Sequence, residues 1–238
     1  MARDAQATGS TASGRRNRGA EVIEAAVAVF NEKGYATASI QDVADRVGVL
    51  KGSLYHYIDS KEDLLARIFD ESDEQSFALM AESRSLDVSA VERLRWFARS
   101  WTVWYLENIE RTAIYVNEWK HLTGKRLKKV MKTRHEYDQR VTEIIRDVVN
   151  DGEAAPDLDV RYACFIVLST INGLPTWYRR GGPDSAEHIA DVYADMIVGM
   201  VCHSDGRARP EKAPTARARA GAKAKAKPKA KAKAKAKS

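Results

Sequence analysis

The chain has 238 residues, of which 44% are hydrophobic, and a formal net charge of +6 at pH 7. This size and composition suit a globular protein with a substantial core, and no apolar run approaches the ~20 residues that span a bilayer. The N-terminus lacks the apolar stretch of a secretory signal, and two distant cysteines do not suggest a disulfide framework or a four-ligand metal site. We therefore expect a cytoplasmic protein without membrane contact, metal or other cofactor.

The positive charge is concentrated at the C-terminus. Residues 204–238 hold 13 of the 39 Lys and Arg but only two of the 33 acids, a net of +11, so residues 1–203 carry −5. The Lys- and Ala-rich composition predicts a disordered tail, because like charges repel and alanine buries little surface. Such a tail would attract polyanions such as DNA without sequence preference. The alternative is a solubilising tail with no dedicated partner.

The chain begins with a basic segment, residues 1–18, that we expect to form a disordered arm. Apolar residues then recur at i, i+4, i+7 and i+8, which predicts an amphipathic helix over 19–33. Gly34 follows directly, as is typical after a helix C-terminus. This helix is expected to open a first domain over residues 19–65.

Two short helices follow the first one. Ser39 and Asp42 have the spacing of a capping box, which predicts a helix over 40–47. A tight Gly-Val-Leu turn separates it from a second short helix over 51–57. This arrangement is typical of a helix-turn-helix motif, whose second helix enters the major groove of DNA. The alternative is a purely structural helical hairpin.

The second short helix has few residues to bury. Leu54 and Ile58 are four apart and can pack on the preceding helix, which leaves the other side chains free to face DNA. Lysine can reach a phosphate or a guanine edge, and tyrosine can bond phosphate oxygens or contact thymine methyl groups. A helix N-terminus can also receive a phosphate. The residues expected to contact DNA are Ser39, Gln41, Lys51, Gly52, Ser53, Tyr55, Tyr57 and Lys61.

Residues 19–66 resemble the N-terminal DNA-binding domain of the TetR family of bacterial repressors. The resemblance rests on F-x-x-x-G-Y at the end of the first helix, the I-x-x-V-A run, the G-V turn, and G-S-L-Y followed by S-K-E-x-L. Leu50 departs from it, since many members have Ser or Thr there to cap the recognition helix. The resemblance implies an all-helical homodimer whose C-terminal domain binds a small effector.

Residues 66–203 have helical periodicity and no strand alternation, so the expected fold class is all-α, with a helical effector-binding and dimerisation domain after the helix-turn-helix domain. Ser60 is the expected cap of the first long helix, and Pro175 should kink or end the fifth. The predicted helices cover residues 62–82, 88–108, 111–122, 125–151, 159–179 and 185–203.

The last two predicted helices are apolar around most of their circumference. The stretches "YACFIVLSTINGL" in 159–179 and "IADVYADMIVGMV" in 185–203 carry few charges. Helices of this kind need burial beyond the surface of their own subunit. A homodimer through helices 159–179 and 185–203 satisfies that need and matches what the resemblance implies. The alternative is that both helices are central in a large monomer core.

Aromatic residues gather in the second domain. All five tryptophans lie between residues 96 and 177, and several aromatics share one face of helix 88–108. Bulky rings packed between helices often surround a ligand pocket, whereas the alternative for any one of them is ordinary core packing. The expected pocket residues are Phe97, Trp101, Trp104, Tyr105, Tyr115, Trp119, Phe165, Trp177 and Tyr178.

The stretch "GKRLKKVMKTRH" has six bases and no acid across residues 125–134. It could receive an anion at the mouth of the pocket, for example the phosphates of a coenzyme A thioester, or it could be an ordinary solvated face. The apolar, aromatic interior and the ending "WYRRGGP" are similar to TetR-family regulators of fatty-acid, steroid or related acyl-CoA catabolism.

These patterns favour a ligand-responsive repressor that binds a palindromic double-stranded DNA operator and a small hydrophobic effector such as an acyl-CoA. The alternative is an architectural, nucleoid-associated protein dominated by its basic tail. An enzyme is not expected, and no catalytic residue is assigned, because the histidines are scattered and no nucleophile elbow, H-E-x-x-H or Gly-rich phosphate loop occurs. The five histidines are His56, His121, His135, His188 and His203.

Overall fold

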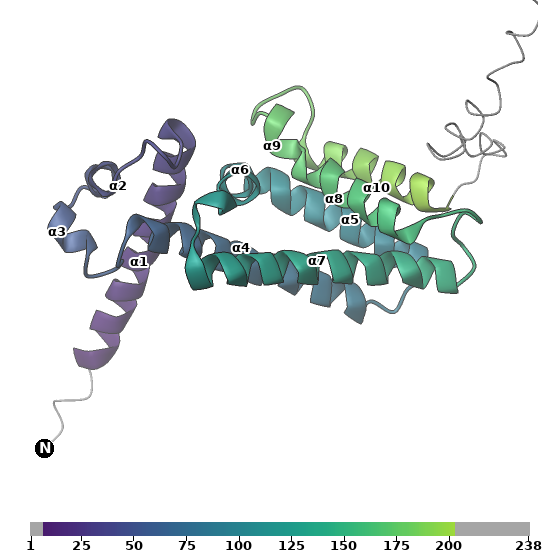
Figure 1. The fold of residues 1–238 in the computed structure, drawn as a ribbon, viewed down its shortest axis with the longest axis horizontal. Coiled ribbons are helices and arrows are strands. Elements are labelled where there is room, and N and C mark those ends of the chain that lie inside the picture. Colours follow the sequence, from purple (N-terminus) through teal and green to yellow (C-terminus); the bar gives the residue numbers. More distant parts are fainter. Residues whose placement is uncertain (1–6, 203–238) are drawn as a thin grey trace, which may run out of the picture. The chain divides into compact units, whose positions relative to one another are not determined.

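The computed structural model describes residues 7–202, and none of these residues lies in a strand, which confirms the all-α fold (Figure 1). The expected tail at 204–238 lies outside the described residues. The α-helices are α1 (Ala7–Lys33), α2 (Ile40–Val47), α3 (Lys51–Leu54), α4 (Lys61–Ser85), α5 (Ala90–Glu107), α6 (Ile109–Asn117), α7 (Gly124–Asn150), α8 (Val160–Asn172), α9 (Leu174–Trp177) and α10 (Ala186–Cys202), with a 3₁₀ turn η1 (Trp119–His121).

Helix α1 begins earlier than the sequence suggested. It starts at Ala7, within the segment 1–18 for which we expected a disordered arm. Once the amphipathic part of a helix is anchored, each further residue adds one hydrogen bond at little cost, so the helix can extend into a polar segment. The anchored part carries Val22, Ala26 and Phe30, which are buried against the rest of the domain.

The capping box in front of α2 is confirmed. The Ser39 side chain accepts a hydrogen bond from the Asp42 N–H, and the Asp42 carboxylate accepts one from the Ser39 N–H. Gly48 ends the helix with φ 76°, a left-handed conformation that glycine adopts without strain. The α2–α3 connection therefore turns tightly, as the helix-turn-helix motif requires.

Helix α3 is shorter than predicted. The α-helix covers Lys51–Leu54, whereas residues 55–57 continue as turns in which His56 and Tyr57 donate to carbonyls three residues back. Leu50 stands at the N-cap and makes no side-chain capping bond. The departure from the family pattern at this position thus coincides with a short helix that depends on Leu54 for its anchorage.

The second domain follows the predicted helices with two breaks. Pro175 interrupts the helix expected over 159–179, and the chain forms α8 and the single turn α9 instead, as its missing N–H predicts. The helix expected over 111–122 ends at Asn117 and is followed by η1. Ser60 caps α4 by accepting from the Asp63 N–H, as predicted.

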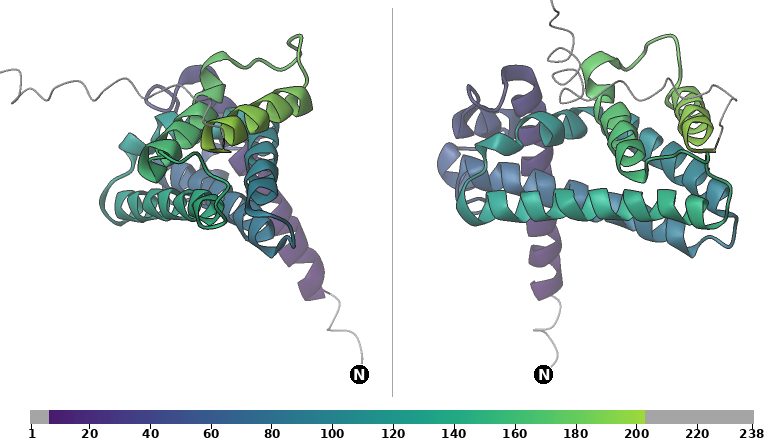
Figure 2. Two further views of the ribbon diagram at one scale, coloured as in Figure 1. Left: turned by 90° about the vertical axis from the view of Figure 1, so that its right-hand side faces the viewer. Right: turned by 45° about the vertical axis from the view of Figure 1, so that its right-hand side comes forward.

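The core of this domain lies between α4, α5, α6 and α7. Phe69 stacks on Tyr115 with ring centroids 4.6 Å apart, and Phe77 stacks on Tyr137 at the same separation. Helix α10 packs against α5 and lies at the edge of the bundle (Figure 2). Helix α1 contacts α4 and α6, so the two domains share an interface. None of the described helices is both long and apolar enough to cross a membrane.

Two leucines four residues apart provide a direct test of how α3 is held. Leu54 has none of its surface exposed, whereas Leu50 is 81% exposed. Leu54→Ala should lower the free energy of unfolding by about 2–5 kcal/mol, because a buried leucine leaves a cavity when truncated. Leu50→Ala should change it by less than about 0.5 kcal/mol. Urea unfolding followed by circular dichroism measures both, and equal midpoints for the two variants would contradict this anchorage.

Candidate DNA-binding surface and ligand cavity

The α3 segment presents the expected division between anchors and exposed residues. Leu54 and Ile58 are buried, whereas Lys51, Gly52 and Tyr55 are exposed, the tyrosine to 51%. An aromatic ring so exposed on a short helix has no partner within the described chain that would explain its size. These residues therefore form a polar and aromatic surface that is available to the edges of bases and to phosphates.

Two other expected contacts are less available. Ser53 is half-buried, and Tyr57 is half-buried with its ring packed against the core, so this ring is not free to face outward as expected. The reason is its position three residues after Leu54 and next to Ile58, which places Tyr57 on the anchored side of the segment. Tyr55 is thus the exposed tyrosine of this segment.

The start of α2 carries an ionised carboxylate, Asp42, whose charge is offset by a lysine. The Lys33 ammonium lies 2.5 Å from Asp42 Oδ1, and this contact, together with hydrogen bonds from Ser39, holds the pKa of Asp42 well below its usual range. Lys33 therefore offsets a negative charge that would repel a phosphate approaching Ser39. Gln41 is exposed, and its amide donates to Asp45 Oδ1 at 2.7 Å.

Lys61 is less exposed than a simple phosphate contact would be. Its Nζ donates to the Ala36 carbonyl at 3.3 Å and lies 4.3 Å from the centroid of the Tyr35 ring. Burial lowers the pKa of Lys61. The side chain thus braces the loop before α2, where its charge remains close to the same surface as Ser39. All eight DNA contacts stay predictions.

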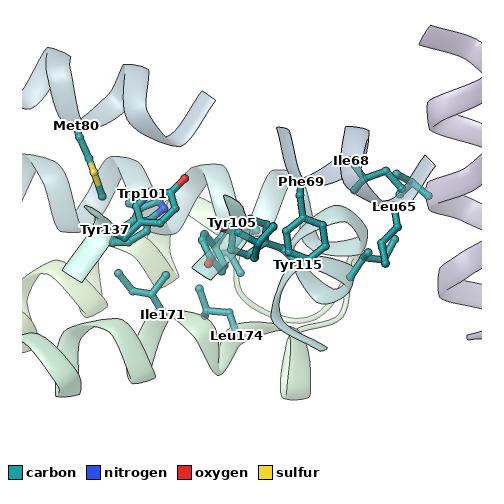
Figure 3. Packing of buried hydrophobic residues seen from close by; sticks show 14 of the residues in the cluster. Leu65, Ile68, Phe69, Met80, Trp101, Tyr105, Tyr115, Tyr137, Ile171 and Leu174 are labelled. Atoms are coloured by element: carbon teal, nitrogen blue, oxygen red, sulfur yellow. The ribbon is translucent and has the colours of Figure 1, made fainter. Parts of the chain in front are cut away.

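A cavity of about 60 Å³ lies within the second domain, between α4, α5, α6, α7 and α8. Four of the nine expected pocket residues line it, and Figure 3 shows three of them, Trp101, Tyr105 and Tyr115, in one aromatic row. The full lining is Ser72, Ser76, Trp101, Trp104, Tyr105, Thr112, Tyr115, Arg134, Tyr137, Asp138, Leu168 and Asn172.

The other five expected residues do not line this cavity. Phe97 is buried behind Trp101, with ring centroids 4.9 Å apart, and Trp119 lies under the Arg134 guanidinium. Tyr178 is half-buried, while Phe165 and Trp177 are exposed. The break at Pro175 therefore does not aim Trp177 into the interior, because α9 is a single turn that brings this ring toward Tyr193 of α10 instead.

A buried carboxyl beside the cavity was missed from the sequence. Asp73 Oδ1 accepts hydrogen bonds from the hydroxyls of Tyr115 at 2.7 Å and Tyr137 at 3.2 Å. Burial raises the pKa of Asp73 to about 6, and it raises the pKa of both tyrosines as well. The signal was present, since Asp73 stands four residues after Phe69 on the apolar stripe of its helix.

Three of the six bases in the run 125–134 pair with acids. Lys129 Nζ lies 2.6 Å from Asp70, and Arg126 lies 3.1 Å from Asp63, both on α4. Lys125 and Lys128 are exposed and pair with no acid among the described residues, so anion binding by this run stays a prediction. Arg134 is different, because it lines the cavity with its guanidinium 4.9 Å from the centroid of the Trp119 ring.

Helix α6 connects the cavity to the DNA-binding domain. Thr112 and Tyr115 line the cavity, while the neighbouring Arg111 is buried and pairs with Glu71 of α4 at 2.7 Å and with Glu24 of α1. Asn31 of α1 also donates to a backbone carbonyl of α6 at 2.8 Å. A shift of α6 would therefore be felt by α1.

The buried Asp73 gives the stability a predictable dependence on pH. A carboxyl whose pKa is higher in the folded protein than in the unfolded chain costs stability as pH rises through that interval. Asp73→Asn keeps the acceptor for Tyr115 but removes the charge. Between about pH 4 and pH 7 the variant should gain ~2–3 kcal/mol relative to the parent. Urea unfolding across this range measures the gain, and parallel pH profiles would contradict the assignment.

Comparisons with known proteins agree with this geometry. The family model "Bacterial regulatory proteins, tetR family" matches residues 22–68, and "Tetracyclin repressor-like, C-terminal domain" matches residues 87–201. The transcriptional repressor KstR2 of Mycolicibacterium smegmatis is 28% identical over 201 residues, which cover 82% of this chain and 96% of that protein.

Solved structures extend the similarity to the fold. The ketosteroid transcriptional regulator KstR2 of Mycobacterium tuberculosis has a TM-score of 0.74 and 25% identity over 79% of this chain and 96% of that one. AibR, solved with isovaleryl coenzyme A and operator DNA, has a TM-score of 0.68 and 23% identity over 78% of this chain and 98% of that one. The chain described here belongs to the TetR family of bacterial transcriptional regulators.

Proposed function

We propose that this family member is a homodimeric repressor that binds a palindromic DNA operator through α3 and leaves it when a small hydrophobic effector, such as an acyl-CoA, enters the α4–α8 cavity. The observation that carries the proposal is the double role of α6, which lines the cavity with Thr112 and Tyr115 and holds α1 through Arg111. Its DNA partner would place its action in the cytoplasm, at the nucleoid.

The proposed dimer surface is the outer face of α8 and α10. Apolar side chains stand exposed along both helices, and one of them, Met196, is 69% exposed. Several large apolar side chains exposed on neighbouring helices are typical of an interaction surface. The exposed members are Tyr162, Phe165, Ile166, Val192 and Met196. If this face pairs across a two-fold axis, the two α3 segments are related by symmetry, and each can contact one half-site of the operator.

The cavity and the relatives support the proposed effector class. Five of the cavity's twelve lining residues are aromatic, which suits a ligand with an apolar body, and six others are polar or charged. The KstR2 structure is of a ketosteroid regulator and the AibR structure contains an acyl-coenzyme A, so both similar proteins are associated with hydrophobic carbonyl compounds. We extend that class of effector to this chain.

The small volume of the cavity supports a mechanism in which the effector releases the protein from DNA rather than one in which it promotes DNA binding. A volume of about 60 Å³ holds a few water molecules, whereas drug-sized ligands occupy roughly 300–1,000 Å³. An effector would therefore have to spread α6 from α7 to enter. Because Arg111 ties α6 to α1, the spread state would hold the α1–α3 domain differently, and DNA and effector would favour different states.

Substitutions on α3 test the DNA-binding assignment. Lys51→Ala and Tyr55→Ala should each weaken operator binding by about tenfold or more, because each contact is lost twice in a symmetric dimer. Both residues are exposed, so the fold and the dimer should persist. Gel shifts on an operator selected from random duplexes measure the affinity, and size-exclusion chromatography measures the dimer.

Lys128→Ala is the matched control, since it removes the same charge from an exposed position on α7. Its operator affinity should stay within about twofold of the parent's, because Lys128 lies outside the helix-turn-helix segment and a single exposed charge is screened by salt. If the two α3 variants bind as tightly as this control, α3 does not recognise the operator.

A further inference from the structure

One residue that lines the cavity carries a buried donor without an acceptor. Trp101 is 4% exposed, and among residues 7–202 no group accepts a hydrogen bond from its Nε1–H. Trp104, which lines the same cavity, differs in this respect, because its Nε1 donates to Gln75 Oε1 at 2.9 Å. An unsatisfied buried donor costs the folded protein free energy, so its retention at a ligand cavity calls for an explanation.

Rings surround the indole of Trp101. It is stacked near Tyr137, with centroids 6.0 Å apart and planes 24° apart, and it meets the edge of Tyr105 at 5.9 Å (Figure 3). Ring faces and edges are poor acceptors compared with a carbonyl oxygen. Burial among these rings therefore leaves the Trp101 N–H dependent on whatever enters the cavity.

Three other polar groups of the lining are already engaged within the protein, whereas the Asp138 carboxyl, whose pKa is raised by burial, lines the cavity without such a partner among the described residues. The Tyr105 hydroxyl donates to Asn172 Oδ1 at 2.6 Å, and the Tyr115 hydroxyl donates to Asp73 at 2.7 Å. Thr112 Oγ1 donates to the Ile109 carbonyl at 3.1 Å. A ligand that lacked an acceptor would find apolar surface here but would leave the Trp101 donor unpaired.

The second unengaged donor of the lining is Arg134. It is half-buried, and it forms no ion pair within 4.0 Å with an acid of the described chain. Its guanidinium instead rests over the rings of Trp119, at 4.9 Å, and Tyr115, at 5.9 Å. A guanidinium held in this way against ring faces is oriented for a carboxylate or phosphate.

We propose that the effector is an apolar molecule that carries both a carbonyl oxygen, which accepts a hydrogen bond from Trp101 Nε1, and an anionic group, which pairs with Arg134. This inference rests on the proposed function, in which the cavity is the effector site. A free oxo acid and its coenzyme A thioester both have this chemistry. Trp101 is then the residue that distinguishes an oxo compound from the saturated acid of equal length.

Matched probes separate the carbonyl contact from packing. Isothermal titration calorimetry on the full chain, without DNA, compares 7-oxooctanoate with octanoate, and the coenzyme A thioesters of the two acids form a second pair. The parent protein should bind the oxo member of one pair. In Trp101→Phe, the affinity for the oxo member divided by that for the saturated member should fall by roughly 3- to 10-fold, because phenylalanine keeps a ring but lacks the donor.

Trp104→Phe is the control for lost ring size, since the Trp104 donor is already satisfied. It should change the affinities for both members of a pair by the same factor. Arg134→Met should weaken both members by about tenfold or more while keeping their ratio, since it removes a charge-assisted contact from each. Thermal melts of each variant confirm that it is folded before the titrations are compared.

The pair that shows the effect identifies the source, free acid or thioester. Unchanged ratios in Trp101→Phe for both pairs, or absence of binding by all four probes to the parent protein, would overturn the proposal. These results are independent of the DNA assay. If a ligand retained from the host still releases the operator while the probes fail, the proposed function stands and the ligand chemistry is wrong.

Discussion

The Arg111 side chain is the ion-pair contact that joins α6 to both α1 and α4. It is buried on α6 and reaches carboxylates on α1 and on α4, Glu24 and Glu71. A guanidinium can satisfy two carboxylates at once because its donors are fixed in a plane. Both partners remain substantially exposed, so the pair is not a deeply buried ion cluster whose desolvation would offset its attraction. The Arg111 pairs therefore fix the position of α6 relative to α1 and α4 more than they raise the free energy of unfolding.

This contact links the α3 surface and the cavity, which place opposite requirements on their side chains. The α3 surface must present side chains that the core does not use, and it achieves this because Leu54 and Ile58 supply the anchorage. The cavity must do the reverse and surround a ligand with side chains that already pack well, such as Tyr115 and Tyr137. Since packed interiors switch between discrete arrangements rather than deform smoothly, opening the cavity would move α6 as a unit.

Local patterns predicted the first surface well and the second only in part. The Ser39 cap, the turn at Gly48 and the burial of Leu54 follow from short-range spacing, so they were visible in the sequence. The cavity depends on which faces of five helices meet, and aromatic content alone could not separate Trp101 from the exposed Trp177. Asp73 and Tyr137 were not predicted, because they stand on α4 and α7, which lack the dense aromatic clustering of the helix over 88–108.

The most direct test of coupling through α6 is the operator affinity with and without the effector that native mass spectrometry identifies in protein from its host. In the parent protein a saturating effector should weaken operator binding by roughly 5- to 150-fold. Arg111→Met keeps the apolar stem but removes the contacts to α1 and α4, so this ratio should fall toward one while the effector still binds. A variant that keeps the full ratio would contradict coupling through Arg111.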